Sequence, residues 1–387
     1  MSKAQFLLPV ALLMLAVGCN STTTSEAGSA DPTALILQPI NTELDRPWGM
    51  DFLNEQEVLV TQKGGQLLWM DTTSGETRDI GGLPVGKDRD DTKEMDEGES
   101  VLLDAGQGGL LDVAIEHTVD GTLVYLSYSH FEKGKGATTR VIRGRLVDDF
   151  LEDVEVLFTA QPYYKQVHHY GSRLLLVDDY LFITVGDRGN RDYAQDVSRH
   201  NGKVMRLHKD GRIPFDNPFV GRDDALPEIW TYGHRNPQGM DQHPDGSIWV
   251  SEHGPKGGDE LNRLEPGTNY GWPIITYGEE YRGGKIGEGT EKPGMAQPIK
   301  YYLPSIATSG ISFNDGERYP GWSDSVLVGA LVLTHLNRVE LDGDGIGEEF
   351  RYFESDGLRI RDVQTGPDGY AYVLAGDGLY RVTPGEG

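Results

Sequence analysis

The stretch Trp48-Gly49-Met50-Asp51-Phe52-Leu53, followed by Val58-Leu59-Val60-Thr61, contains the sequence unit that decides the fold. Its two short apolar runs are separated by a polar turn, which is the pattern of a β-hairpin. The full unit has a small-residue turn, an apolar strand, an Asp/Asn-Gly turn, a strand rich in Val, Leu, Tyr or Trp, and a further strand ending in a basic residue. No long amphipathic helix follows residue 34, so the sequence predicts an all-β domain.

The same unit recurs five more times, at irregular spacings of about fifty to seventy residues. Three copies carry an Asp-Gly pair just before the second strand, where a tight hairpin needs a positive φ angle. These pairs are Asp120-Gly121, Asp245-Gly246 and Asp368-Gly369. The recurrences are residues 109–114 with 123–128, 172–176 with 181–185, 238–240 with 247–250, 309–313 with 325–328, and 361–363 with 370–374.

Six short sheets cannot each bury both faces alone, but a radial arrangement packs them against one another and leaves only protected edges. We therefore predict an all-β fold, a single six-bladed β-propeller with four-stranded antiparallel blades, over residues 34–387. The apolar run 34–37 is expected to complete the last blade and close the ring. The long charged segment 85–100 is expected to be a solvated acidic insertion.

The first 33 residues have the composition of an export signal and a tether. An apolar run over residues 6–17 follows a short positive start and is too short to span a bilayer well, which indicates a signal peptide. The run ends at Cys19, the only cysteine, in a motif that resembles a bacterial lipobox. We expect residues 1–19 to be a lipoprotein signal and 20–33 a flexible tether. The mature protein would then be exported to the periplasm and anchored in the outer membrane through lipidated Cys19, with ordinary cleavage near Gly18 as the alternative.

The charge balance is strongly acidic, with 61 Asp and Glu residues against 35 Lys and Arg residues and a formal net charge of −26. Phosphate binding needs a basic surface, so the composition argues against nucleic acid as a partner. An acidic surface favours solubility and is compatible with cation sites.

Polar residues beside the starts of the expected innermost strands are the candidates for the functional site. One end of a propeller channel gathers loops from every blade, so these residues are expected to meet there. The set contains one base, three guanidiniums, amides and backbone carbonyls: Gln107, His169, Arg235, Asn236, Gln238, Gly254, Pro255, Arg359 and Arg361. Histidine is a natural base near neutral pH, arginines fork onto carboxylates, and carbonyl oxygens suit calcium. Such a pocket would suit a flat polyanionic cofactor.

Neighbouring polar and aromatic residues are expected to have structural roles. We expect His168 to face away from the site, and His234 and His253 to brace turns. Trp48, Trp249 and Trp272 are expected to pack between blades. For Arg188, reach into the pocket and an ion pair with Asp187 or Asp192 both remain open.

Six motifs, taken together and in order, resemble the soluble aldose sugar dehydrogenases that use pyrroloquinoline quinone, the glucose/sorbosone dehydrogenase family. Any one of them alone would be weak, but the resemblance covers nearly the whole chain after the tether. The motifs lie at residues 106–112, 169–174, 232–239, 252–262, 269–273 and 359–363.

The resemblance implies a six-bladed propeller that oxidises the anomeric hydroxyl of an aldose to a lactone. His169 is implied as the general base, with hydride passing to the quinone. The implied cofactor contacts are Gln107, Arg235, Asn236, Gln238, Tyr281, Arg359 and Arg361. Backbone oxygens of Gly254 and Pro255 are implied as ligands of one Ca²⁺, and Glu260 and Tyr270 as part of a further calcium site. An aldose substrate, an electron acceptor that the sequence does not identify, and a monomer or dimer complete this expectation.

One residue departs from the family pattern. Gly329-Ala330-Leu331-Val332 has valine where the family places a lysine against the cofactor. Losing a charged hydrogen bond to an anionic cofactor costs about 1.5–3 kcal/mol. Two alternatives therefore stay open: a cofactor-poor propeller that binds a sugar or a protein, which Val332 favours, and a calcium-dependent lactonase. The arginine-rich pocket argues against the lactonase, because a hydrolase needs no polyanion clamp.

Overall fold

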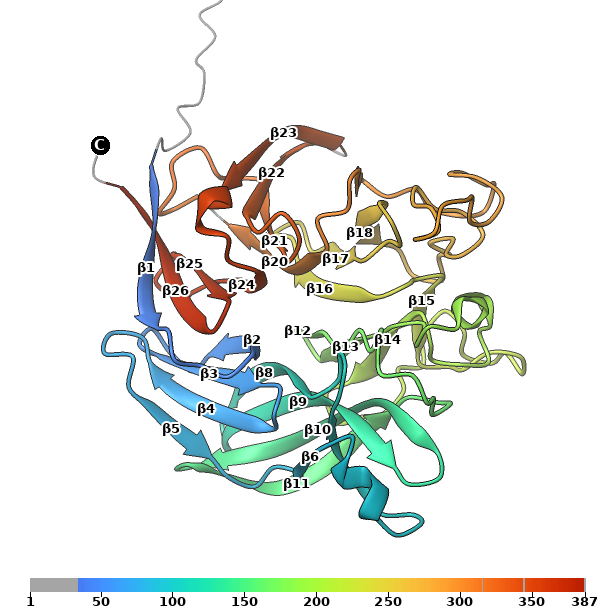
Figure 1. Ribbon diagram of the computed structural model, residues 1–387, viewed down its shortest axis with the longest axis horizontal. Helices are drawn as coiled ribbons and strands as arrows, with labels where there is room; N and C mark the ends of the chain where they lie inside the picture. The colour runs from blue at the N-terminus through green and yellow to red at the C-terminus, as the bar shows by residue number, and fades with distance from the viewer. Residues whose placement is uncertain (1–33, 315, 344, 386–387) are drawn as a thin grey trace, which may run out of the picture.

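The structure is a computed structural model that describes residues 34–314, 316–343 and 345–385. Six sheets stand around a common centre, as a six-bladed β-propeller (Figure 1). The predicted fold class is thereby confirmed. The predicted signal at 1–19, Cys19 and the tether at 20–33 lie outside the described residues. Within the described ranges, no helix is long and apolar enough to cross a membrane.

Each blade has four antiparallel strands at its core, which run outward from the channel in chain order except that β1 forms the outer strand of blade six. Blade one contains β2 (Pro47–Phe52), β3 (Glu57–Gln62), β4 (Gln66–Asp71) and β5 (Thr77–Ile80). Blade two contains β8 (Leu110–Thr118), β9 (Gly121–Glu132), β10 (Gly136–Val147) and β11 (Phe150–Thr159). Blade three contains β12 (Leu174–Val177), β13 (Tyr180–Val185), β14 (Lys203–His208) and β15 (Ile229–Tyr232).

The second half of the ring repeats this arrangement. Blade four contains β16 (Pro237–Gln242), β17 (Ile248–Glu252), β18 (Asp259–Leu264) and β19 (Lys300–Tyr302). Blade five contains β20 (Thr308–Asn314), β21 (Ser325–Ala330), β22 (Leu336–Asp342) and β23 (Gly345–Tyr352). Blade six contains β24 (Ile360–Thr365), β25 (Ala371–Ala375), β26 (Gly378–Pro384) and β1 (Leu35–Asn41). The described helical turns are η1 (Asp91–Glu94), η2 (Arg191–Gln195) and η3 (Glu354–Asp356).

The ring is closed by the N-terminal strand. β1 pairs antiparallel with β26, so that Leu35 lies opposite Pro384 and Leu37 opposite Val382. The first and last strands of the chain therefore share one sheet (Figure 1). This confirms that the apolar run at residues 34–37 completes the last blade.

The segment predicted to be a solvated acidic insertion is partly built into the second blade. β6 (Gly86–Asp88) pairs in parallel with β7 (Ser100–Asp104), and β7 pairs with β9. These two short strands extend the blade to six strands. Most of the segment is exposed, as expected, but its pairing with the blade was not foreseen, because the repeat pattern carries no information about pairing by an inserted segment.

Apolar side chains fill the gaps between blades. Of the nine buried clusters in the described part of the chain, six are each made by one pair of neighbouring blades. In the gap between blades one and two, for example, Leu59 packs with Val124 and Leu126. Most inner and second strands are therefore buried on both faces, which explains their continuous apolar runs.

Carboxylates on the innermost strands link neighbouring blades through backbone hydrogen bonds. In four of these links, a carboxylate accepts from a backbone N–H of the next blade's innermost strand. The pairs are Asp51 with Ile115 N at 2.6 Å, Asp112 with Leu174 N at 2.7 Å, Asp241 with Phe313 N at 2.8 Å, and Asp362 with Met50 N at 3.1 Å. Such bonds satisfy backbone groups that face the channel rather than a sheet partner.

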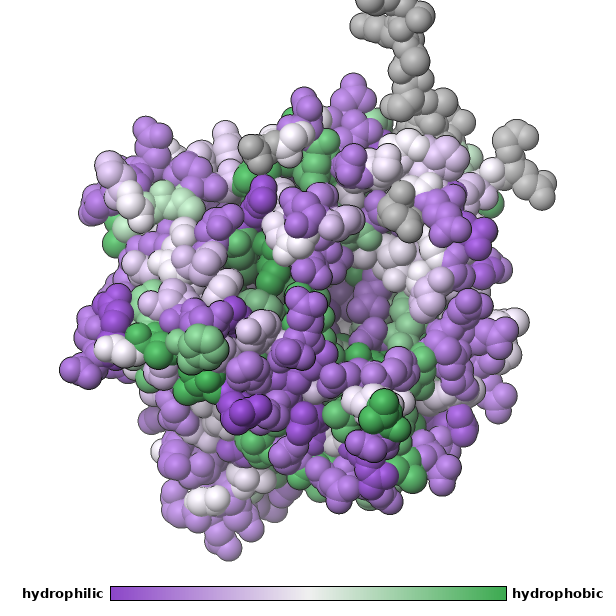
Figure 2. Space-filling model, turned by 180° about the vertical axis from the view of Figure 1, so that it is seen from behind, coloured by the Kyte–Doolittle hydropathy of each residue, from purple (hydrophilic) through white to green (hydrophobic). Residues whose placement is uncertain are grey.

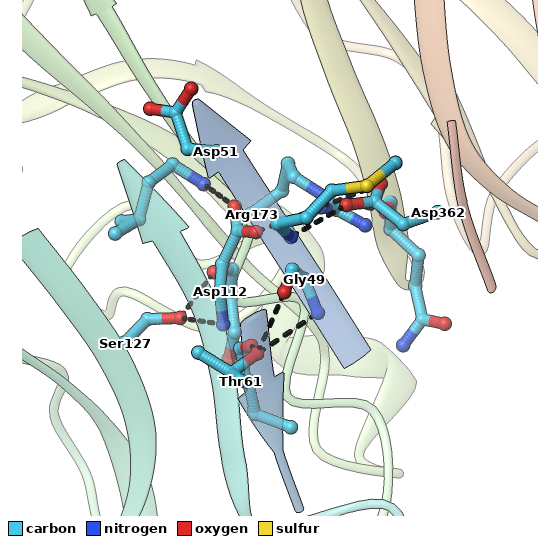
Figure 3. A network of polar contacts seen from close by, with 12 residues as sticks. Gly49, Asp51, Thr61, Asp112, Ser127, Arg173 and Asp362 are labelled. Carbon is cyan, nitrogen blue, oxygen red and sulfur yellow. Dashed lines mark hydrogen bonds and ion pairs between the residues drawn. The ribbon is translucent and has the colours of Figure 1, made fainter. Parts of the chain in front are cut away.

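Arg173 crosses the centre of the channel and joins these links (Figure 3). Its Nη1 lies 2.8 Å from Asp112 Oδ1 and 2.9 Å from Asp362 Oδ1, and its guanidinium stacks over Trp48 at 4.5 Å. Where the inner strands end, the channel widens into a cavity of about 610 Å³ that Arg173, Asp51 and Asp241 help to line. One end of the ring is visibly hollowed at its centre (Figure 2).

Close packing around these carboxylates demands glycine on the facing inner strands. A Cβ on Gly310 would lie 2.1 Å from Asp362 Oδ1. We expect Gly310→Ala to lower the free energy of unfolding by about 1–3 kcal/mol, because the inner strand or the carboxylate must move. Gly289→Ala is the matched control, since its added Cβ meets nothing within 4 Å. Chemical denaturation measures both, and equal stability of the two variants would contradict this packing account.

Candidate active site

Turns before the innermost strands of blades two to four, the segment after β13 and the loops on either side of β18 enclose a cavity of about 340 Å³, here called the histidine cavity. Five of the predicted site residues line it: Gln107, His169, Arg235, Pro255 and Tyr281. His168, Asp187, Gly189, Arg191, Trp272 and Glu280 complete the lining. The structure thus brings together predicted residues from blades two, three and four.

His169 is held in place from two sides. Its backbone takes a positive φ of 54°, and its N–H donates to Gln107 Oε1 at 2.7 Å. Its Nδ1 lies 2.7 Å from Asp187 Oδ1. A carboxylate only accepts, so Nδ1 carries the proton and the neutral ring presents a free lone pair at Nε2.

Asp187 is fixed just as firmly. It follows β13, and its Oδ1 also accepts the Gly189 N–H at 2.7 Å. Its Oδ2 accepts the indole N–H of Trp272 at 2.8 Å. Because each oxygen has a defined donor, the carboxylate cannot rotate away from His169.

The environment keeps His169 neutral and Asp187 charged. Burial lowers the pKa of His169, and Arg235 lowers it further, although the hydrogen bond to Asp187 opposes both. Burial alone would raise the pKa of Asp187, but the hydrogen bond with His169 and the charge of Arg235 bring it below its ordinary value. The pair is therefore a neutral imidazole oriented by a carboxylate, which is the arrangement of a general base.

The two amide side chains predicted for the site support the His169 turn. Gln107 Oε1 accepts from His169, and Asn236 Oδ1 accepts the Gly171 N–H at 3.1 Å. The Nδ2 of Asn236 is buried and has no hydrogen-bond partner in the part of the chain that the structure describes. A buried unsatisfied donor is costly, so it favours a bound acceptor group at this position.

Three arginines of the predicted set lie at the same end of the channel. Arg235 donates to Gly254 O at 2.8 Å, Arg359 to Leu331 O at 2.8 Å, and Arg361 to Gln238 Oε1 at 2.8 Å. Burial, together with the charges of Arg173 and Arg359, lowers the pKa of Arg361 to about 10. Each guanidinium keeps unused N–H donors. This cluster of positive charge, with Arg235 buried, Arg361 half-buried and Arg359 exposed, fits a polyanionic ligand.

Three of the four predicted metal-binding residues surround a second, very small cavity. Gly254, Glu260 and Tyr270 line about 10 Å³ of space, about enough for one water molecule or ion, whereas Pro255 lines the histidine cavity. Burial raises the pKa of Glu260, and the neighbouring Glu252 raises it further. A cation would relieve both effects, and carboxylate and carbonyl oxygens suit calcium. Over the described ranges, no cluster of three or more His, Cys, Asp or Glu side chains suited to a metal occurs.

Several neighbours differ from their expected roles. His168 lines the histidine cavity instead of facing away, with its ring edge-on to His169 at 4.7 Å. Arg188 forms neither predicted ion pair; it donates to backbone carbonyls of Gln166 and His168 and stacks on Tyr170 at 3.4 Å. His234 braces its turn as expected, between Glu252 and Thr231.

Three functional candidates were missed by the sequence analysis. Asp187 was considered only as a possible ion-pair partner of Arg188, because nothing in the sequence shows that its turn faces His169. Trp272 was assigned to inter-blade packing, yet it lines the cavity and holds Asp187. Lys63 adds a cation: its Nζ donates to Gly106 O at 2.8 Å, and burial lowers its pKa, with Arg361 adding to the effect.

Tyr281, which lines the histidine cavity, and Val332, which follows the Leu331 carbonyl that binds Arg359, are both exposed. The Tyr281 residue is 70% exposed and Val332 47% exposed. Val332 N donates to Ile306 O, and the carbonyl of the preceding Leu331 accepts from Arg359. The valine side chain therefore offers no charge beside the arginine cluster.

Comparisons with known proteins agree with this geometry. A family model described as Glucose / Sorbosone dehydrogenase matches residues 44–381. The chain is 37% identical over 371 residues to aldose sugar dehydrogenase YliI of Escherichia coli strain K12, covering 93% of this chain and 96% of that protein. It is 28% identical over 271 residues to quinoprotein glucose dehydrogenase B of Acinetobacter calcoaceticus, covering 62% of this chain and 52% of that protein. The apo-form crystal structure of the soluble Escherichia coli aldose sugar dehydrogenase matches with a TM-score of 0.83 and 35% identity, covering 91% of this chain and all of that one (100%).

The pairing of His169 with Asp187 predicts how the imidazole titrates. Burial depresses its pKa, so we expect His169 to take up its proton only below its ordinary value of about 6.5. Asp187→Asn removes the carboxylate that holds the pKa up, so titration should shift to still lower pH. NMR titration of labelled histidines measures this, with His169→Ala to assign the signal among the 10 histidines. A rise in the pKa of His169 on Asp187→Asn would contradict the assignment.

Proposed function

The chain belongs to the glucose/sorbosone dehydrogenase family, and we propose that it oxidises the anomeric C1 hydroxyl of aldoses to lactones with pyrroloquinoline quinone and Ca²⁺ as cofactors. The observation that carries the proposal is the neutral His169 held by Asp187 at the wall of a cavity that arginines also line. A hydrolase or a simple sugar-binding module has no use for both features together.

His169 acts as the general base in this proposal. Its Nε2 takes the proton of the anomeric hydroxyl while the hydrogen of the same carbon leaves with its electron pair. Asp187 stabilises the imidazolium that forms and keeps the ring in the orientation that presents Nε2. When bound, pyrroloquinoline quinone supplies the two-electron acceptor and Ca²⁺ the positive charge that polarises it. The sugar thereby loses two electrons and two protons and becomes the lactone.

The cofactor would be held by the residues that form the cation and amide set. Arg235, Arg359 and Arg361 would bind its carboxylates, and the unpaired amide of Asn236 would donate to one of its oxygens. Gln107, Gln238 and Tyr281 complete the proposed contacts. For calcium, we propose backbone oxygens of Gly254 and Pro255, and a further site with Glu260 and Tyr270. The name of the Acinetobacter relative, a quinoprotein, supports a quinone as the cofactor.

A cofactor-poor binding module is the second candidate, and Val332 is the observation that favours it. The lactonase alternative has no comparable support, because the arginines would serve no purpose in lactone opening. The proposal also includes export as a periplasmic, outer-membrane lipoprotein through Cys19, with an aldose as substrate and a monomer or dimer as the working unit.

Reconstitution tests the dehydrogenase assignment. We expect purified protein to bind pyrroloquinoline quinone with Ca²⁺, seen as a change in the quinone absorbance, and then to reduce a dye when aldoses are added. His169→Ala should keep the binding spectrum and lose about 10²- to 10⁴-fold in kcat, because it removes only the base. Absence of both the binding spectrum and dye reduction would overturn the assignment, and full activity of His169→Ala would overturn the assigned base.

Position 332 tests why this chain departs from its family. We expect Val332→Lys to tighten quinone binding by about tenfold or more, because it adds a charged hydrogen bond beside the arginine cluster. Fluorescence titration of the calcium-loaded protein with the quinone measures the Kd. Val332→Met is the matched control, since it lengthens the side chain without charge. Equal Kd values for the two variants would show that the family lysine has no place in this pocket.

A further inference from the structure

Two side chains that line the histidine cavity have no part in the proposed chemistry, and they form an ion pair with each other. Arg191, on η2, reaches Glu280, in the loop at residues 276–289. Arg191 Nη1 lies 2.7 Å from Glu280 Oε1 and its Nη2 lies 3.3 Å from Oε2, so the guanidinium meets both carboxylate oxygens. Two residues that are 89 positions apart in the chain are thereby joined at the wall of the cavity.

Stability does not explain why this ion pair lies here. The Arg191 side chain is 44% exposed and that of Glu280 40% exposed, and an exposed ion pair contributes little to the free energy of folding. The loop has other supports: Thr276 N donates to Gly289 O at 3.0 Å, and Glu279 exchanges two backbone hydrogen bonds of 3.1 Å with Lys256. The backbone that carries Glu280 is therefore held in place without Arg191.

The charges of the cavity lining balance. The lining contains two arginines, Arg191 and Arg235, and two carboxylates, Asp187 and Glu280. Asp187 is already occupied by His169 and an indole N–H, and Arg235 by backbone carbonyls. In the ion pair, the guanidinium keeps further N–H donors and each carboxylate oxygen keeps a second lone pair. The pair therefore offers donors and acceptors to hydroxyl groups while it presents no net charge.

The charged residues beside the pair do not disturb this balance. Asp192 follows Arg191 in the chain, and Glu279 and Arg282 flank Glu280. Lys256 forms its own ion pair with Glu279, with its Nζ 2.9 Å from Oε1. These two carboxylates and two cations are exposed, and none of them lines the histidine cavity. Neutralising one partner of the Arg191 pair thus moves the cavity one charge away from balance.

We propose that the ion pair of Arg191 and Glu280 selects the sugar by its charge, admitting uncharged aldoses and excluding those that carry a carboxylate or an ammonium group. The inference rests on the proposed dehydrogenase function. A neutral sugar exchanges hydroxyl hydrogen bonds with both partners while their ion pair stays intact. Glu280 repels an anionic sugar and Arg191 repels a cationic one, so either sugar must break the pair in order to bind.

Two aldoses with opposite charges at the same carbon, glucuronate and 6-amino-6-deoxyglucose, test the proposal at neutral pH, with glucose as the reference. In reconstituted protein, we expect Glu280→Gln to raise kcat/KM for glucuronate relative to glucose by about three- to tenfold, because the repelling charge is gone. Arg191→Met should do the same for the amino sugar. A pair that only braced the loop would affect all three sugars alike, so opposite charge preferences of the two variants identify recognition.

Glu279→Gln is the matched control, since it removes the same charge one residue away and outside the cavity lining. At physiological salt it should change these ratios by less than about twofold, because exposed charges are screened. Exchanging the partners, Arg191→Glu together with Glu280→Arg, keeps the ion pair and should restore the preference for glucose.

Calorimetric titration with the two charged sugars measures the same preference without turnover. Opposite charge preferences in a protein that binds these sugars and oxidises no aldose would keep the charge-selective site and refute the dehydrogenase function. In an active enzyme, equal changes for both charged sugars, or no change for either, would overturn the inference and leave the dehydrogenase function standing.

Discussion

The pairing of Arg173 with Asp112 and Asp362 at the centre of the channel is the interaction on which the rest of the ring depends (Figure 3). Burial raises the pKa of both aspartates, and the arginine between them opposes that rise. Removing one partner of such a group leaves an unpaired buried charge, which costs far more than the pair contributes. The inner strands of blades two, three and six are therefore held in one register. His169 lies four residues before Arg173 in the chain. This pairing therefore also helps to fix the position of the His169 side chain in the histidine cavity.

Residues from three neighbouring blades together form the candidate site. His169 comes from the turn before blade three, Asp187 from the hairpin of the same blade, Gln107 from blade two and Asn236 from blade four. The contacts of Gln107 and Asn236 with the His169 turn each cross a gap between two blades, and apolar clusters fill these two gaps. Packing between blades thus sets the geometry of the base, and the side chains that line the cavity need little rearrangement to bind a rigid cofactor.

The fold was predictable because its determinants are local. Apolar runs recur in each unit and Asp-Gly turns in three of them, and the apolar run at residues 34–37 pairs with the last strand. His169, Arg235 and Asn236 could be predicted as candidate site residues because they lie beside the starts of the innermost strands. The roles of Asp187 and Trp272 could not be predicted. The contact of Asp187 with His169 depends on the positive φ of His169, and its contact with Trp272 depends on a loop that folds back over the channel.

The pairing of β1 with β26 has a consequence for how the molecule is made. Gln38 and Arg381 meet across this sheet although 343 residues separate them in the chain. The first strand to be synthesised therefore has no sheet to join until the last one exists. Contacts of this separation form late and slowly, because the whole intervening chain must first be ordered. A prematurely terminated chain would leave an open ring with two unpaired edges, the kind of species that aggregates or is degraded. Only a chain that contains both β1 and β26 can therefore close the ring.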